Sequence, residues 1–143
     1  MKNKKQTDFR AELRDRGLRA TPARLAVCVA LRQASAPLTH AEVARRLDDR
    51  GTDQTTVFRN LNDLVEVGLV RRLEVGDHVY RFEWCGSNDA GQAHAHFVCV
   101  ECGEVTCLPD MRPSAASSIQ RAGKRLIGDI TEVLLKGHCA HCA

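Results

Sequence analysis

The chain has 143 residues, which is enough for one ordinary domain or two small ones. It has no run of about 18 apolar residues, as a membrane span requires, and its first residues do not resemble a secretion signal. We therefore expect a cytoplasmic protein with reduced thiols and no membrane partner. The net charge of +3 is uneven, because the excess of Lys and Arg lies within residues 1–83. That half is the candidate for binding a polyanion, although a solvated surface explains so modest an excess equally well.

The first part of the chain has the pattern of successive short helices. A helical segment is predicted over residues 8–16, and Pro22 opens a second helix whose apolar face includes Cys28. Thr39 begins a third helix as part of a capping box, and Gly51 is its stop signal. We therefore expect Cys28 to be a core residue of a small helical domain.

The fourth helix is predicted to begin near Asp53 and to end at Gly68, because apolar residues recur along it at helical spacing. Alternating residues then predict a β-hairpin with a basic face over residues 69–83, in which Gly76 and Asp77 form the turn and the second strand begins at His78. This order is that of a winged helix-turn-helix, in which the last helix enters the DNA major groove. A small helical protein-interaction domain capped by a hairpin is the alternative. The outer face of the fourth helix presents side chains that hydrogen-bond to phosphates or base edges: Gln54, Thr55, Thr56, Arg59, Asn60 and Asn62.

Residues 84–93 have loop composition and predict a hinge between a DNA-binding domain at 1–83 and a second domain at 94–143. The fold class is therefore α/β (α+β). A segment as small as the second domain buries little apolar area, so zinc and a partner subunit must stabilise it. The elements expected there are strands over residues 97–100 and 104–108, a helix from 113 to about 126, and a strand over 130–135.

Two Cys-x-x-Cys pairs are the most informative motif of the second domain. They are Cys99 with Cys102, and Cys139 with Cys142. Four thiolates in two such pairs are a preferred ligand set of a closed tetrahedral zinc site, so we expect one structural Zn²⁺ per chain. A disulfide or a redox pair is the alternative. A thiol oxidoreductase would place a reactive pair at the start of a helix, and neither pair precedes an obvious helix.

A second group of metal-binding residues surrounds the hinge. His94 and His96 precede the first cysteine pair and point to one side of an extended chain. A solvated side chain or a small buried thiol is the ordinary reading of any single member, but the clustering favours a second, regulatory metal site. Mixed His, Cys and carboxylate ligands satisfy Zn²⁺. The further candidate donors are Glu83, Cys85, Cys107 and His78.

Enzyme classes with related motifs do not fit. A zinc deaminase needs His-x-Glu and a Pro before its first cysteine, whereas this chain has His94-Ala95-His96 and Val98 before Cys99. The chain also has no paired catalytic carboxylates, phosphate-binding glycine loop or nucleophile motif. We therefore expect no enzymatic activity.

The chain resembles the ferric uptake regulator (Fur) family of bacterial metal-dependent repressors over nearly its whole length. The stretches that carry the resemblance are residues 17–24 (GLRATPAR), 56–61 (TVFRNL), 94–99 (HAHFVC), 102–105 (CGEV) and 137–142 (GHCAHC). The family implies a homodimer joined through the C-terminal domains, a structural zinc held by four cysteines, and a sensory metal at the hinge. It also implies metal-promoted binding to an AT-rich inverted repeat. By position, Phe58 replaces a base-contacting tyrosine, and Arg19 matches a basic residue that reaches DNA.

The resemblance also bears on the sensed metal. Glu83, His94 and His96 fall on family sensor positions, but Cys107 replaces the carboxylate of iron and peroxide sensors. A thiolate suits Zn²⁺ better than Fe²⁺. The chain is thus most similar to zinc-uptake regulators, with an iron- or manganese-responsive regulator as the alternative. A zinc-stabilised interaction module without DNA binding is the alternative of another class.

Overall fold

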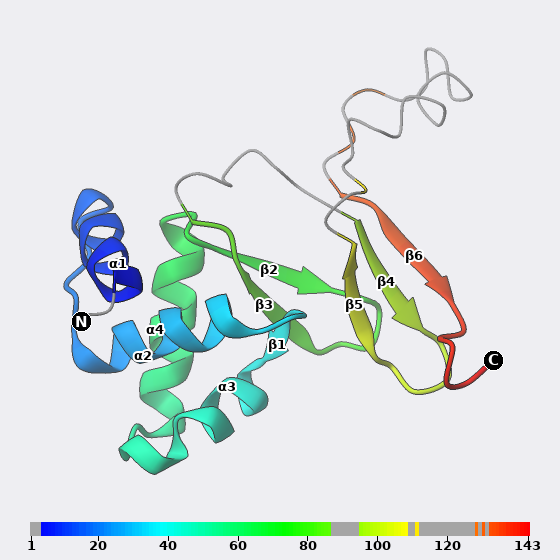
Figure 1. Cartoon of the computed structure of the whole chain (residues 1–143), viewed down its shortest axis with the longest axis horizontal. Coiled ribbons are helices and arrows are strands. Elements are labelled where there is room, and N and C mark those ends of the chain that lie inside the picture. Colours follow the sequence, from blue (N-terminus) through cyan, green and yellow to red (C-terminus); the bar gives the residue numbers. More distant parts are fainter. Residues whose placement is uncertain (1–3, 87–94, 109–110, 112–127, 129, 131) are drawn as a thin grey trace. The chain divides into compact units, whose positions relative to one another are not determined.

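The structure is a computed structural model of the chain, and it describes residues 4–86, 95–108, 111, 128, 130 and 132–143. The chain divides into two compact units, Met1–Ala90 and Gly91–Ala143 (Figure 1). The helix predicted from residue 113 to about 126 lies outside the described residues. None of the described helices has both the length and the apolar character that a bilayer crossing requires.

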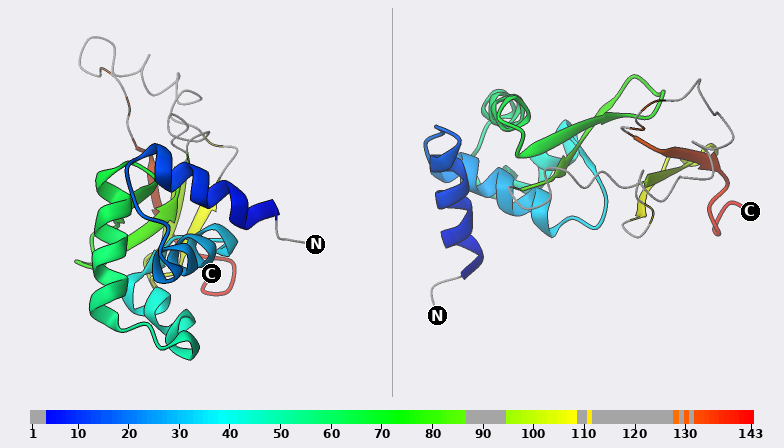
Figure 2. Two further views of the ribbon diagram at one scale, coloured as in Figure 1. Left: turned by 90° about the vertical axis from the view of Figure 1, so that its left-hand side faces the viewer. Right: turned by 90° about the horizontal axis from the view of Figure 1, so that it is seen from above.

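The first unit contains the predicted succession of helices and hairpin, which forms a winged helix-turn-helix. Its helices α2, α3 and α4 pack against one another, and α1 packs on α2 (Figure 2). The short strand β1 and the 3₁₀ helix η1 have no counterpart among the predicted elements. The elements are α1 (Lys4–Asp15), α2 (Pro22–Gln33), β1 (Leu38–Thr39), α3 (His40–Arg46), η1 (Asp48–Arg50), α4 (Gln54–Glu66), β2 (Val70–Glu74) and β3 (Tyr80–Trp84).

Side-chain caps fix the starts of the three packed helices. The Thr21 hydroxyl accepts a hydrogen bond from the Arg24 amide ahead of α2. Thr39 and Glu42 form the predicted capping box of α3. The Asp53 carboxylate accepts a 2.6 Å bond from the Thr56 amide at the start of α4, which lowers the pKa of Asp53. Each cap satisfies amides that the first helical turn leaves without a partner.

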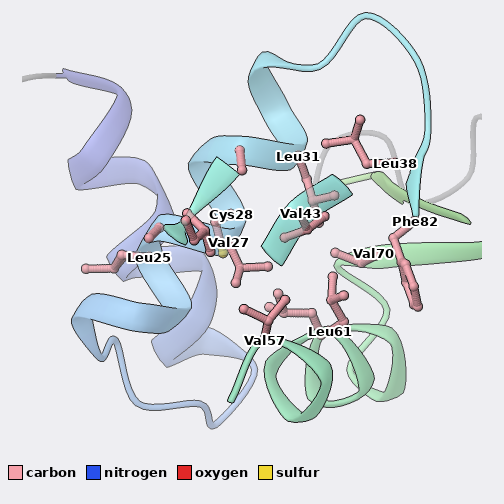
Figure 3. Packing of buried hydrophobic residues seen from close by; sticks show 14 of the residues in the cluster. Leu25, Val27, Cys28, Leu31, Leu38, Val43, Val57, Leu61, Val70 and Phe82 are labelled. Carbon is pink, nitrogen blue, oxygen red and sulfur yellow. The ribbon is translucent and has the colours of Figure 1, made fainter. Parts of the chain in front are cut away.

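The apolar faces of the helices and of the hairpin form one core (Figure 3). Cys28 is fully buried there, which confirms its predicted place. Because the sheet covers one side of the helices, the core fixes how α4 is held in this unit. Residues that α2, α3, α4, β2 and β3 contribute to the core include Leu25, Val27, Leu31, Val43, Val57, Leu61, Val70 and Phe82.

The hairpin pairs β2 with β3, and β1 adds to the free edge of β3, giving the antiparallel order β1-β3-β2. The strand that was predicted from His78 begins instead at Tyr80. His78 has φ +61 and belongs to the turn, which Asp77 stabilises by accepting a hydrogen bond from the Val79 amide at 3.2 Å. Because the backbone at His78 is left-handed, this residue cannot be part of the strand, and β3 starts two residues later than the residue pattern indicates.

Helix α1 covers the end of the hairpin where the chain leaves the first unit. Phe9 is buried and meets Trp84 edge-on, with ring centroids 5.0 Å apart. Gly86 follows with φ +65, and a Cβ atom at this position would lie 3.0 Å from the Trp84 Nε1 atom. The exit strand is therefore packed closely against α1, and any other residue at this turn would be strained.

The second unit contains a three-stranded sheet with the order β5-β4-β6. Strand β4 pairs antiparallel with β5 and parallel with β6. The last strand lies four residues later at its start than predicted, because pairing with β4 and not local alternation decides which residues are extended. The strands are β4 (Ala95–Cys99), β5 (Val105–Leu108) and β6 (Leu134–Gly137).

Candidate metal sites and nucleic-acid interface

The second unit brings the four cysteines of the two Cys-x-x-Cys pairs together. The sulfur atoms of Cys99, Cys102, Cys139 and Cys142 all lie within 4.8 Å of one another, and those of Cys102 and Cys139 are 4.0 Å apart. Tetrahedral zinc with Zn–S bonds of about 2.3 Å places its sulfurs about 3.8 Å apart. The arrangement is therefore compatible with zinc after a small contraction.

The sheet positions these two pairs. In the parallel register Cys99 lies beside Gly137, and the Val100 amide donates to the Gly137 carbonyl at 2.8 Å. Each pair then turns on itself, because the Gly103 amide donates to the Cys99 carbonyl at 2.9 Å and the Cys142 amide to the Cys139 carbonyl at 3.0 Å. Two turns at the ends of adjacent strands thus face one point.

The backbone already favours a negative charge at this point. The backbone amides of Cys102 and Cys139 lower the pKa of the Cys99 thiol to about 6, and the Cys139 amide nitrogen lies 3.3 Å from the Cys99 sulfur. Hydrogen bonds to the Cys139 and Cys102 sulfurs raise the pKa of Cys142 to about 12. Four clustered thiols cannot all ionise without a cation, so a metal that binds here displaces protons from the others.

The candidate regulatory metal site includes two potential ligands that lie side by side. His96 lies directly opposite Cys107 across β4 and β5, and a ring nitrogen of His96 lies within 4.8 Å of the Cys107 sulfur. His96 is 1% exposed and Cys107 is half-buried. Opposed side chains of neighbouring strands point to the same face, so one ion is within reach of both.

The remaining predicted donors are distributed as follows. Glu83 and Cys85 lie at the exit end of the first unit, where the Cys85 sulfur is 3.7 Å from the Glu83 carbonyl oxygen. His78 lies at the opposite end of the hairpin, fully exposed and 3.8 Å from a Glu74 carboxylate oxygen. A strand rises about 3.3 Å per residue, so His78 is too far along the hairpin to share one ion with Glu83 and Cys85, contrary to the prediction. His94 lies outside the described residues.

The outer face of α4 is the candidate nucleic-acid interface. Thr56 and Asn62 are half-buried, while four other side chains on this face are exposed. They are amide, hydroxyl, guanidinium and aromatic groups, which can reach base edges or phosphates. The exposed residues are Gln54, Thr55, Phe58 and Arg59.

Asn60 is not part of this face, contrary to the prediction. It is 6% exposed and lies on the inner row of α4 with Val57, Leu61 and Leu64. Residues spaced by three and four share one face of a helix, so the position of Asn60 follows from the same period as the core residues. Its amide faces the core rather than solvent.

Arg24 connects two parts of this interface. Its guanidinium bonds to the Asp63 carboxylate on α4 at 2.6 Å and to the Arg19 carbonyl at 2.8 Å. The Arg24 side chain is 12% exposed, whereas Arg19 itself is exposed. The loop that carries Arg19 is thereby tied to the candidate recognition helix. Sequence reasoning missed this role, because no local pattern marks a pair 39 residues apart.

His40, the first residue of α3, was also given no functional role by the sequence analysis. Its Nε2 atom lies 2.9 Å from the Gln54 carbonyl oxygen, and its ring meets the Phe58 ring with centroids 5.6 Å apart at 83°. His40 thus touches two residues of the outer α4 face. No local pattern in the sequence indicates these contacts, because they depend on how α3 crosses α4.

Residues 15–122 match the ferric uptake regulator family. The chain belongs to this family. One curated relative of the Fur chain is the ferric uptake regulation protein of Neisseria gonorrhoeae, which is 30% identical over 92% of this chain and 91% of the relative. Another is the peroxide-responsive repressor PerR of Staphylococcus aureus (strain Mu50), which is 28% identical over 92% of this chain and 87% of the relative. A similar solved structure is the Vibrio cholerae ferric uptake regulator, with TM-score 0.73 and 26% identity, covering 92% of this chain and 100% of that chain. Another is the Pseudomonas aeruginosa ferric uptake regulator with manganese, with TM-score 0.66 and 27% identity, covering 91% of this chain and 96% of that chain.

The family decides between the broad alternatives of the sequence analysis. Fur family members are metal-responsive transcription regulators that bind operator DNA as dimers, and they are not enzymes. The interaction module without DNA binding is therefore set aside. The cysteine cluster of this Fur protein is compatible with a zinc site.

Proposed function

We propose that this Fur protein is a cytoplasmic, zinc-responsive repressor that controls zinc-uptake genes. It binds an AT-rich inverted repeat as a homodimer. The observation that carries the choice of metal is Cys107, which lies opposite the buried His96. The thiolate is a soft sulfur ligand and the imidazole is a nitrogen ligand, and together they suit Zn²⁺ better than Fe²⁺ or Mn²⁺.

For the roles of the domains, the proposal keeps the bounds expected from the sequence. Residues 1–83 bind DNA, residues 84–93 form the hinge, and residues 94–143 dimerise and hold metal. The structural zinc is held by the four clustered cysteines, whose sulfur spacing fits a tetrahedral ion. Bound there, zinc would join the two turns that follow β4 and β6.

The regulatory site takes His96 and Cys107 as its first two ligands, with His94 and a hinge donor, Glu83 or Cys85, as the others. Zinc needs about four ligands, and these residues are close in sequence to His96. Because the hinge donors belong to the first unit, an ion held by both sets would restrict the orientation of the DNA-binding unit. A coupling of about 1–3 kcal/mol tightens DNA binding by about 5- to 150-fold.

The DNA contacts come from the outer face of α4 and from the loop before α2. Exposed polar and aromatic groups on α4 can reach base edges, and the Arg19 guanidinium can reach a phosphate. The proposed contact residues are Arg19, Gln54, Thr55, Thr56, Phe58 and Arg59.

The decisive experiment titrates DNA binding against free Zn²⁺, Fe²⁺ and Mn²⁺. A duplex selected by the protein from a random library serves as operator. Wild type should respond to the lowest free concentration with Zn²⁺. Cys107→Asp should shift this preference toward Fe²⁺ or Mn²⁺, because a carboxylate replaces the soft ligand. His96→Ala should stay a folded dimer with one zinc per chain and lose the response to added zinc.

Cys107→Ala supplies the matched control. If its zinc titration superimposes on that of wild type, Cys107 is not a ligand and the argument for zinc fails. A wild-type response to Fe²⁺ or Mn²⁺ at lower free concentrations would instead favour the iron- or manganese-responsive function.

A further inference from the structure

His40 is the first residue of α3, and its side chain touches the α4 face that we propose reads DNA. The Gln54 carbonyl can accept a hydrogen bond from His40 Nε2 at 2.9 Å, which requires the proton on that nitrogen. The same ring meets Phe58 at 83° in an edge-to-face contact, with centroids 5.6 Å apart. Gln54 and Phe58 are one helical turn apart, so one imidazole contacts successive positions of the outer row.

Phe58 is unusual on this face because it is a large apolar side chain with 53% of its surface exposed. An exposed aromatic ring on a helix can occupy more than one rotamer. A contact with DNA requires one of them, and restricting the ring beforehand lowers the entropy lost on binding. The edge-to-face contact with His40 favours one ring orientation.

The apolar group that a phenyl ring recognises in the major groove is the thymine methyl. We propose that His40 is a positioning residue that holds the Phe58 ring for contact with a thymine methyl group of the operator. This inference rests on the proposed role of α4 in DNA recognition. Within that role it assigns a base feature to Phe58 and a specific task to His40.

A purely structural role for His40 makes a different prediction. If His40 only joined α3 to α4, its removal would weaken binding to every duplex by the same factor. If His40 orients Phe58, its removal weakens the discrimination between thymine and uracil, which differ only by the methyl group. Methyl discrimination is therefore the readout that separates the two roles.

The experiment uses the zinc-loaded full chain and the library-selected duplex, in which dU replaces dT one position at a time. Removing a methyl group from an apolar contact costs wild type about fourfold in affinity at the thymine that is read. Phe58→Ala should bind the dT and dU duplexes equally at that position. His40→Ala should lose at least half of the wild-type discrimination on a logarithmic scale.

Two further variants control for folding and for general loss of binding. His40→Gln keeps an N–H donor for the Gln54 carbonyl but lacks the ring, so it should be as stable as wild type and still lack the discrimination. Arg59→Ala should bind more weakly while keeping the discrimination, because it leaves the His40 and Phe58 contact intact.

Two outcomes would overturn the proposal, and they are distinguishable. If His40→Ala and His40→Gln keep the full dT preference, His40 does not position Phe58, and α4 remains the reading helix. If Phe58→Ala keeps the wild-type pattern at every thymine, Phe58 reads no methyl group and its place among the proposed DNA contacts is wrong as well.

Discussion

Burial in the helical core raises the pKa of the Cys28 thiol to about 12, from 9.0 for a solvated thiol. Between these two values the unfolded chain loses the proton while the folded chain keeps it. The contribution of the Cys28 thiol to the free energy of unfolding is therefore fully present below pH 9 and is lost as the pH rises toward 12. We expect Cys28→Val, which has no ionising group, to show a smaller loss over this range, measured by urea unfolding followed by circular dichroism. Parallel curves for the two proteins would show that Cys28 titrates normally.

Arg59 is an exposed cation on the outer face of α4, and its contact type is measurable. A bidentate contact with a base would make Arg59→Ala about 1–3 kcal/mol weaker in operator binding, with relaxed preference at one position. A phosphate contact would lower affinity for all sequences and reduce the salt slope by about one. Unchanged affinity for the selected duplex in Arg59→Ala would remove this residue from the interface.

At the scale of elements, Arg24 holds the loop before α2 on α4. Arg24→Met removes the guanidinium and leaves the Asp63 carboxylate without this partner, so we expect a loss of about 1–3 kcal/mol in the free energy of unfolding. Arg24→Lys should restore part of it. A double-mutant cycle with Asp63→Asn measures the coupling. Additive effects of the two single changes would show that the pair does not stabilise the loop.

The elements also show where local sequence patterns are sufficient. Helix α4 begins after Asp53 and ends just before Gly68 as predicted, because a cap and a stop signal act within a few residues. Strand β6 could not be placed in this way, because its register with β4 depends on a partner far away in the chain. The start of β3 was misplaced because the left-handed backbone at His78 has no glycine to mark it.

In the candidate sites, too, local sequence patterns predict some features, while others depend on tertiary contacts. The convergence of the four cysteines follows from spacing, because each pair supplies both sulfurs from one short turn. The contact of His40 with Phe58 depends on how α3 crosses α4, for which the sequence has no local signal. The burial of Asn60 was available from the helical period, but its polar side chain suggested the outer face.

At the scale of the whole molecule, the second unit should depend on metal and the first should not. The first unit has a continuous apolar core, whereas the described part of the second is one small sheet ending in the cysteine cluster. We expect Cys99→Ser to lose its structural zinc and its dimer while keeping the helical signal of α1–α4. Metal analysis, size-exclusion chromatography and circular dichroism measure the three. Retention of both zinc and dimer would refute the four-cysteine assignment.

Trp84 is the only tryptophan of the chain, and it lies between Glu83 and Cys85 in a T-shaped contact with Phe9. The protein therefore carries a single indole fluorophore, which is next in sequence to both candidate hinge ligands. Its emission should change when metal fills the regulatory site, and Phe9→Leu should alter the baseline by loosening the indole. Zn²⁺ has a filled d shell and should shift the emission without paramagnetic quenching, whereas Mn²⁺ and Fe²⁺ are open-shell ions. One unlabelled titration thus reports the occupancy of the proposed hinge site, and quenching or its absence separates the open-shell ions from Zn²⁺.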